Sequence, residues 1–205
     1  MSAPRLKSIL ESLIFISDVP VSFDRLCGIL GDYAREDIRS ALDALQEEYG
    51  KPGRGVFLAE VAKGYQFRTS EENGEYVRRL YKTKVSRFSQ SALETLAIVA
   101  YRQPITRAEI EYLRGVDSGG VIKTLLEKKL VRILGKKDIP GRPLIYGTTR
   151  EFLEIFGLKD LKALPTLKEI EDLSTERLRE QQEELPLDDL HDDESGGETS
   201  EKEDN

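Results

Sequence analysis

One cysteine and one histidine, Cys27 and His191, are the only residues of their types in the sequence. A cysteine nucleophile needs a base within hydrogen-bond reach, and no histidine precedes position 191. A lone cysteine cannot form an intramolecular disulfide, and one cysteine with one histidine cannot make a zinc site of the Cys/His kind. Carboxylate pairs such as Glu47 and Glu48 fall on the solvent side of amphipathic helices. We therefore predict no catalytic residues, no metal ligands and no cofactor.

Acidic residues are concentrated near the C-terminus. The 205 residues carry a net charge of −7, but residues 166–205 contain 16 acidic and four basic side chains, so residues 1–165 carry +5. Too few apolar groups lie in 166–205 to offset the entropy of ordering, and we predict an acidic, mostly disordered tail there. No run approaches the roughly 18 to 20 apolar residues of a membrane span. We expect a cytoplasmic protein with no membrane contact.

The spacing of apolar residues predicts three helices followed by a β-hairpin near the N-terminus. The first helix carries Leu6, Leu10 and Ile14, the second begins at Ser22 as N-cap, and the third spans Ile38 to Tyr49. Two β-rich runs follow, at 56–61 and 65–69. This order is typical of a winged-helix domain.

A shift of 84 residues superimposes two segments of the sequence. Pro20, Val21 and Ser22 fall on Pro104, Ile105 and Thr106, and Gly31 falls on Gly115. Thr106 and Glu109 have the spacing of a capping box. The second copy continues with a helix through Ile122 to Leu130, strands at 131–134 and 144–146, and a short helix at 150–156. We predict an α+β, mainly helical fold with two tandem winged-helix domains, at residues 1–70 and 89–165, joined by a helical linker at 71–88.

Winged-helix domains often bind DNA through the third helix. In the first domain this helix carries a net charge of −3, which disfavours contact with a polyanion. In the second domain the equivalent helix and wing are basic, so DNA contact there stays open as a secondary function. The wing sequence 139–146 combines prolines with apolar residues, which suits a protein partner better than phosphates. The basic side chains of that helix are Lys123, Lys128 and Lys129, and those of the wing are Arg132, Lys136, Lys137 and Arg142.

The first helix has apolar residues around more of its circumference than one small core can cover. We expect the excess to form a homodimer interface on the first domain. The residues assigned to this interface are Leu13, Ile14, Phe15 and Ile16.

Long strings in the second domain resemble the bacterial segregation and condensation protein B family. They are ALETLAIVAYRQPITRAEIE at 92–111, VIKTLLE at 121–127, PGRPLIYGTT at 140–149 and EFLEIFG at 151–157. The resemblance covers about residues 6–165 and is weaker in the first domain. It implies a non-enzymatic accessory subunit of the bacterial structural-maintenance-of-chromosomes (SMC) complex, with two winged-helix domains, dimerising through the first and gripping the kleisin subunit ScpA mainly through the second.

The resemblance also implies indirect contact with the SMC ATPase through the kleisin, a role in chromosome condensation and segregation during cell division, and association with the nucleoid. Tyr and Arg are the residue types that most often anchor interfaces. We therefore assign kleisin binding to the corner at 101–104 and to the wing, specifically to Tyr101, Arg102, Gln103, Arg142, Pro143, Leu144 and Tyr146. The alternative function is a tandem winged-helix regulator that binds DNA.

Overall fold

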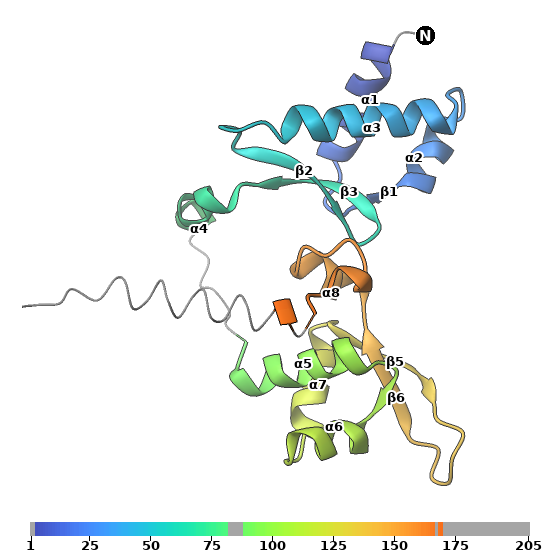
Figure 1. The fold of residues 1–205 in the computed structure, drawn as a ribbon, viewed down its shortest axis with the longest axis vertical. Helices are drawn as coiled ribbons and strands as arrows, with labels where there is room; N and C mark the ends of the chain where they lie inside the picture. The colour runs from blue at the N-terminus through green and yellow to red at the C-terminus, as the bar shows by residue number, and fades with distance from the viewer. Residues whose placement is uncertain (1–2, 82–87, 167, 170–205) are drawn as a thin grey trace, which may run out of the picture. The chain divides into compact units, whose positions relative to one another are not determined.

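A computed structural model describes residues 3–81, 88–166 and 168–169. The first half of the molecule, residues 3–69, contains three helices and three short strands (Figure 1). In chain order they are α1 (Ala3–Phe15), β1 (Val21–Ser22), α2 (Phe23–Ile29), α3 (Arg35–Tyr49), β2 (Val56–Val61) and β3 (Gly64–Thr69). The strands pair antiparallel in the order β1-β3-β2.

The core of the first half forms where the apolar faces of its helices meet the sheet. Leu6, Leu10 and Ile14 lie one turn apart on α1 and are almost fully buried. The long helix α3 runs over the β2–β3 hairpin (Figure 1) and buries Ile38, Leu42 and Leu45 in the same cluster.

A short 3-10 turn, η1 (Glu71–Asn73), and helix α4 (Gly74–Tyr81) follow the first half. Of the helical linker predicted at 71–88, residues 82–87 lie outside the described residues. The second half, residues 90–164, has the same order of elements with two additions at its end. It contains α5 (Gln90–Arg102), β4 (Ile105–Thr106), α6 (Arg107–Arg114), α7 (Gly119–Glu127), β5 (Val131–Lys136), β6 (Leu144–Thr148), α8 (Arg150–Ile155) and η2 (Leu161–Ala163).

The repeat in the sequence corresponds to equivalent backbone features in the two halves. Val21 pairs with Tyr65 in the first sheet, and Ile105 pairs with Tyr146 in the second, whose order is β4-β6-β5. Both predicted N-caps are confirmed. The Ser22 Oγ accepts a hydrogen bond from the Arg25 backbone N–H, and Thr106 forms a complete capping box with Glu109.

Three boundaries differ from the prediction. The alignment of Gly31 with Gly115 predicts the same helix-ending role for both, but helix α2 ends at Ile29 with Leu30 as its C-cap, whereas Gly115 is a left-handed C-cap at φ 72°. Helix α7 ends at Glu127, and Leu130 enters the core from the following turn. Strand β5 continues to Lys136 through a bulge between Ile133 and Gly135. A bulge adds one unpaired residue, which the alternation of side chains does not reveal.

The tip of the β2–β3 hairpin bonds to the segment that follows α8. The backbone N–H groups of Ala62 and Lys63 donate to the carbonyl oxygens of Leu158 (2.8 Å) and Lys159 (2.9 Å). The Lys159 ammonium also lies 2.7 Å from the Glu60 carboxylate. Val61 and Ala62 are buried in the same apolar cluster as the core of the second half. These contacts connect the two halves independently of the linker.

Most of the tail predicted at 166–205 lies outside the described residues. Where it is described, the Thr166 backbone N–H and hydroxyl both donate to the Glu169 carboxylate. Among the described helices, none combines the length and apolar character needed to cross a membrane.

Candidate partner-binding surfaces

The end of α1 presents two large apolar side chains to solvent. Phe15 is 77% exposed and Ile16 is 78% exposed. Phe15 also borders a hollow of about 340 Å³ whose wall includes Tyr49, Val56 and Phe67. The Tyr49 hydroxyl donates to the Glu11 carboxylate, which raises the pKa of Tyr49, and the Tyr49 ring packs edge-on against Phe67 at 4.7 Å between centroids. This end of the first half is therefore an apolar surface with a fixed wall.

The predicted dimer interface needs one correction. Ile14 is only 1% exposed because it points into the core of its own half, so it cannot face a partner while that half is folded. Leu13 is partly buried against the same core. Helical spacing places positions 10 and 14 on the buried face, which leaves Phe15 and Ile16 as the outward pair.

In the second half, the predicted corner at 101–104 divides into exposed and structural residues. Tyr101 and Arg102 are exposed at the end of α5. Gln103 instead holds the corner to strand β6. Its side-chain amide donates to the Thr148 hydroxyl (2.9 Å) and the Ala100 carbonyl (3.1 Å), and its side-chain oxygen accepts from the Thr148 backbone N–H (2.9 Å). We therefore reassign Gln103 from partner contact to positioning of the corner.

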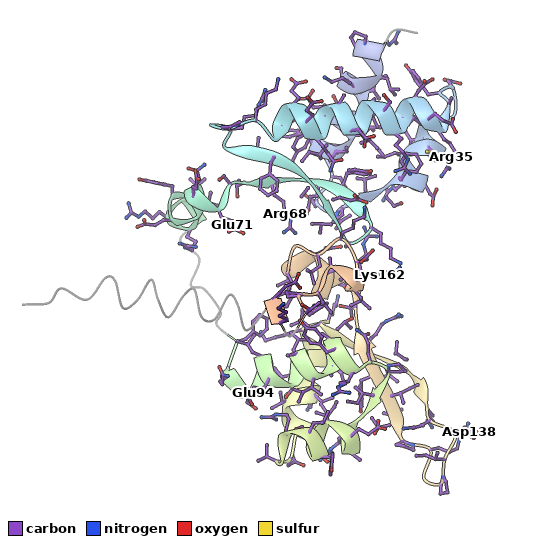
Figure 2. All side chains as sticks on the ribbon, viewed as in Figure 1. Arg35, Arg68, Glu71, Glu94, Asp138 and Lys162 are labelled. Carbon is purple, nitrogen blue, oxygen red and sulfur yellow. The ribbon has the colours of Figure 1, made fainter. Side chains whose placement is uncertain are left out.

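The predicted wing residues are also spread over different environments. Tyr146 is 7% exposed and belongs to the core, which corrects its assignment to a partner surface. Leu144 is partly buried and packs against that core, and Pro143 is half-buried. Only Arg142, at φ 40° in the turn, is exposed, on a hairpin that projects from the helices of its half (Figures 1 and 2). Arg142 lies four positions before Tyr146, which pairs with Ile105 beside the corner, so about 13 Å of extended chain sets the wing tip apart from the corner.

A groove beside the corner contains residues that the sequence analysis did not select. Its volume is about 470 Å³, and Arg102, Pro104, Tyr112 and Leu113 contribute to its lining. Tyr112 is 87% exposed although it lies on an amphipathic helix. The sequence of α6 did contain a signal for this exposed surface. Among the described side chains of this helix only Ile110 is buried, although the helix also carries Tyr112 and Leu113.

One carboxylate in the lining of this groove is held by three hydrogen bonds. Glu109 accepts hydrogen bonds from the Lys137 ammonium (2.6 Å) and from the Thr106 backbone N–H and hydroxyl (2.8 Å each). These donors, with Lys137 the strongest, lower the pKa of Glu109 to about 2. Lys137 directly follows β5, so the ion pair connects the loop end of the β5–β6 hairpin to α6. Because Lys137 is paired with Glu109, it is not a free cation of the predicted wing.

Several of the basic residues that could contact DNA form ion pairs or stack on an aromatic ring within the chain. On α3, the Arg35 guanidinium pairs with Asp24 at 2.6 Å, and Arg35 and Arg39 both lie over the Phe23 ring. In the second half, the Lys123 ammonium lies 3.9 Å from Glu127. Helix α3 therefore has few free cations on an otherwise acidic face.

Cys27 is half-buried on α2 against the core of the first half. Within 3–81, 88–166 and 168–169, no group of three or more His, Cys, Asp or Glu side chains could hold a metal ion. His191 lies outside the described residues. The surfaces described above offer apolar contacts, charge and hydrogen bonds to a partner.

Comparison with known proteins gives matches over both halves. The family model for the segregation and condensation complex subunit ScpB matches residues 8–167. The segregation and condensation protein B of Syntrophotalea carbinolica is 54% identical over 176 residues, which cover 86% of this chain and 89% of that protein.

Two solved structures are also similar. The crystal structure of ScpB from Mycobacterium tuberculosis is 32% identical with a TM-score of 0.37, covering 77% of this chain and 98% of that one. A structure described as a dimer of the ScpB N-terminal domain complexed with ScpA peptide is 23% identical with a TM-score of 0.35. The match covers 38% of this chain and 95% of that one. The family match and the curated relative extend over both halves. This chain belongs to the segregation and condensation protein B family.

Proposed function

We propose that this chain is a non-catalytic accessory subunit of a bacterial SMC–kleisin complex and acts in chromosome condensation and segregation during cell division. The observation that carries the proposal is the family match over residues 8–167, which includes both halves of the described fold. The exposed residues support it, because they are apolar and aromatic side chains suited to protein contacts. The protein then works in the cytoplasm at the nucleoid.

The two halves are proposed to be winged-helix domains at residues 1–70 and 89–165, with a linker at 71–88 and a disordered acidic tail at 166–205. Support comes from the shared order of three helices and a β-hairpin, and from the equivalent short strands β1 and β4 that pair with the return strand of each hairpin.

A homodimer is proposed to form through the first domain. Phe15 and Ile16 are the exposed apolar pair at the end of α1, and the hollow beside Phe15 can receive a side chain from a second copy. An isologous dimer uses the same patch on both copies. The Phe15 side chain of each copy would therefore contact the α1 end of the other copy.

The second domain is proposed to bind a segment of the kleisin ScpA, which in turn connects this subunit to the SMC ATPase. Tyr101 and Arg102 border the groove that contains Tyr112 and Leu113. Exposed tyrosine, arginine and leucine around a groove match the composition of anchoring sites in protein interfaces. Arg142 contributes separately from the projecting hairpin.

Purification of the chain with ScpA from the same genome tests this function, with the mass of the complex measured by light scattering. We expect a stable complex that contains two copies of this chain. Substitution Tyr112→Ser with Leu113→Ser should weaken ScpA binding by roughly tenfold or more, since each anchor side chain contributes about 1 to 2 kcal/mol. Tyr76→Ser, at an exposed tyrosine of α4, is the matched control and should bind ScpA normally. Failure of the wild-type chain to bind ScpA would refute the proposal.

The second candidate function, a DNA-binding regulator, predicts tight DNA binding through the third helix of a domain. The pairing of Arg35 with Asp24 and the stacking of Arg39 on Phe23 disfavour this use of α3. Sequence-specific DNA binding without ScpA affinity would favour the regulator.

A further inference from the structure

A second concave surface lies where the tip of the β2–β3 hairpin meets the segment around α8. This cleft has a volume of about 860 Å³ and is lined from both halves of the chain. Lys63 and Ser22 come from the first half, whereas Arg132, Thr149, Arg150 and Lys162 come from the second. It shares none of its lining residues with the groove beside α6. The cleft is therefore a separate site from the one proposed for ScpA.

The lining of the cleft carries a net positive charge, and several of its cations form no ion pair within the described residues. Four cations and two carboxylates, Glu151 and Asp160, line the surface. Arg150 is already engaged, because its guanidinium lies 3.2 Å from Glu154 and donates to the Pro20 carbonyl. The remaining three cations, Lys63, Arg132 and Lys162, have no side-chain hydrogen bond or ion pair within the described residues. Neither lining carboxylate, Glu151 nor Asp160, is paired with a described side chain, so three cations face two carboxylates and leave a net charge of +1.

The rim that carries Lys63 is held in place by the backbone. Lys63 has a positive φ of 60° at the hairpin tip, and its N–H donates to the Lys159 carbonyl at 2.9 Å. The Asp160 carboxylate accepts from the Lys162 backbone N–H at 2.8 Å and so fixes the turn that presents Lys162. Arg132 lies on β5, an edge strand of its sheet. The three cations thus project from fixed positions into one surface.

Side-chain hydroxyls in the cleft are already used by the fold. The Thr149 hydroxyl donates to the Lys129 carbonyl at 2.6 Å and accepts from the Phe152 N–H, and the Ser22 hydroxyl accepts from the Arg25 N–H. No aromatic side chain lines the cleft within the described residues, and two of its three apolar lining residues, Ala62 and Leu153, are already buried in the core, which leaves Leu161 as the exposed one. A peptide interface normally needs a buried aromatic or apolar anchor, whereas sequence-independent binding of a nucleic acid needs only placed cations. The chemistry of the cleft favours phosphate groups.

We propose that this cleft binds the phosphate backbone of duplex DNA through Lys63, Arg132 and Lys162, without reading the base sequence. Each cation that neutralises a phosphate releases condensed counterions, so the affinity falls steeply with salt. The interaction goes beyond ScpA binding and does not depend on it.

The test measures binding of the full chain to labelled mixed-sequence duplex DNA by fluorescence anisotropy, from about 50 to 200 mM salt. We expect micromolar affinity at low salt and a loss of roughly tenfold or more in the triple variant Lys63→Gln, Arg132→Gln, Lys162→Gln. The slope of log affinity against log salt should become shallower by about 3, or about 1 for each lost contact.

A charge-matched control separates the cleft from overall charge. The variant Arg5→Gln, Arg25→Gln, Lys51→Gln removes three exposed cations that do not line the cleft. It should keep wild-type DNA affinity and salt slope. Equal losses in both variants, or no DNA binding by the wild-type chain, would overturn the proposal. Binding of a labelled polyglutamate peptide in preference to DNA would also overturn it and assign the cleft to an acidic protein segment. All three chains should bind ScpA equally, so this result is independent of the proposed function.

Discussion

Arg114 shows how a single charged residue can organise a small helical core. Its side chain is only 7% exposed, at the end of α6. It donates to the Ser91 hydroxyl on α5 (2.9 Å) and to the Ser118 hydroxyl at the start of α7 (3.0 Å) and pairs with Glu94. Its Nε is buried with no hydrogen-bond partner among the described residues. An arginine at the end of an amphipathic helix is ordinarily exposed, so sequence alone did not identify this role.

We expect Arg114→Ala to lower the free energy of unfolding by about 1 to 3 kcal/mol. The substitution removes charge-assisted hydrogen bonds and leaves the buried Ser118 hydroxyl and the half-buried Ser91 hydroxyl with fewer partners. Urea denaturation measures the change. Lys123→Ala, at a side chain that is 78% exposed, is the control and should change stability by less than about 0.5 kcal/mol. A similar small change in Arg114→Ala would show that the buried arginine contributes no net stability.

The pKa of Glu109, lowered to about 2, makes stability depend on pH in the acid range. A carboxylate with a lowered pKa in the folded state stabilises the protein above its unfolded pKa of about 4.5, and this contribution is lost as the pH falls toward 2. The melting temperature of the wild type should therefore decrease more between pH 5 and pH 3 than that of Glu109→Gln. The difference is modest because the carboxylate is 45% exposed and solvent screens it.

Glu47→Gln is the matched control, at an exposed carboxylate of α3 with no ion pair in the described residues. Its acid profile should follow the wild type. Parallel profiles for the wild type and Glu109→Gln would show that the contacts with Lys137 and Thr106 do not stabilise the fold.

At the scale of elements, features set by neighbouring residues were predictable. The N-caps at Ser22 and Thr106 follow from a hydroxyl before an apolar helix, and the buried stripe of α1 follows from the spacing of Leu6, Leu10 and Ile14. Features that depend on residues distant in the sequence could not be predicted. The burial of Ala62 and the docking of Lys63 depend on carbonyl groups almost 100 residues later in the chain. Local sequence patterns contain no information about such partners.

Two glycines in the first half should respond in opposite directions to alanine. At Gly64, where β3 meets β1, an added Cβ would lie 2.9 Å from the backbone carbon and oxygen of Val21, and backbone atoms cannot move aside cheaply. Gly64→Ala should therefore lower stability by about 1 to 3 kcal/mol. Gly28 lies inside α2 with nothing within 4 Å of an added Cβ. Gly28→Ala should raise stability by about 0.5 to 1 kcal/mol because alanine favours the helix.

Thermal and urea denaturation of the two variants give the comparison directly. An unchanged Gly64→Ala protein would contradict the close approach of β1 and β3. A destabilised Gly28→Ala protein would show that the exposed side of α2 is covered by another surface, such as a second copy of the chain.

The exposed end of α1 gives a prediction about association. The double variant Phe15→Ser, Ile16→Ser should weaken the homodimer by roughly 100-fold or more, since burying each large apolar side chain contributes about 1.5 to 3 kcal/mol. Sedimentation equilibrium should show the wild type as a dimer and the variant as a monomer at tens of micromolar. Because both side chains are exposed within one chain, the variant should remain folded. Ile155→Ser, at a 56% exposed residue of α8, is the control and should stay dimeric. A wild-type monomer would rule out this interface.

Across the whole molecule, the proposed partner surfaces lie at the edges of the two cores. The cores themselves contain the apolar residues that the helical and strand patterns predicted, whereas Tyr112, Leu113 and the basic cleft were found only when distant segments were brought together. Predicting which apolar residues a core leaves exposed requires the arrangement of its helices. This explains why Ile14 and Tyr146 were assigned to surfaces although both are buried.

The acidic segment at 166–205 gives the final prediction. In the described part of the chain, both apolar clusters are complete at Leu164, and none of their members follows it. Truncation after Pro165 should therefore change the melting temperature by less than about 2 °C, which corresponds to under about 1 kcal/mol for a protein of this size. The comparison belongs at moderate salt, because truncation also removes a net charge of −12.

A loss of several degrees would instead show that the segment docks on the rest of the chain. The full-length variant Leu167→Ser, Ile170→Ser, Leu173→Ser, Leu178→Ser separates the two causes of such a loss, since it keeps every charge and removes the apolar residues that a docked helix would bury. If it melts like the truncated chain, apolar docking accounts for the lost stability. If it melts like the wild type while the truncated chain does not, the acidic charges stabilise the basic body through long-range attraction, and the difference should then disappear in high salt.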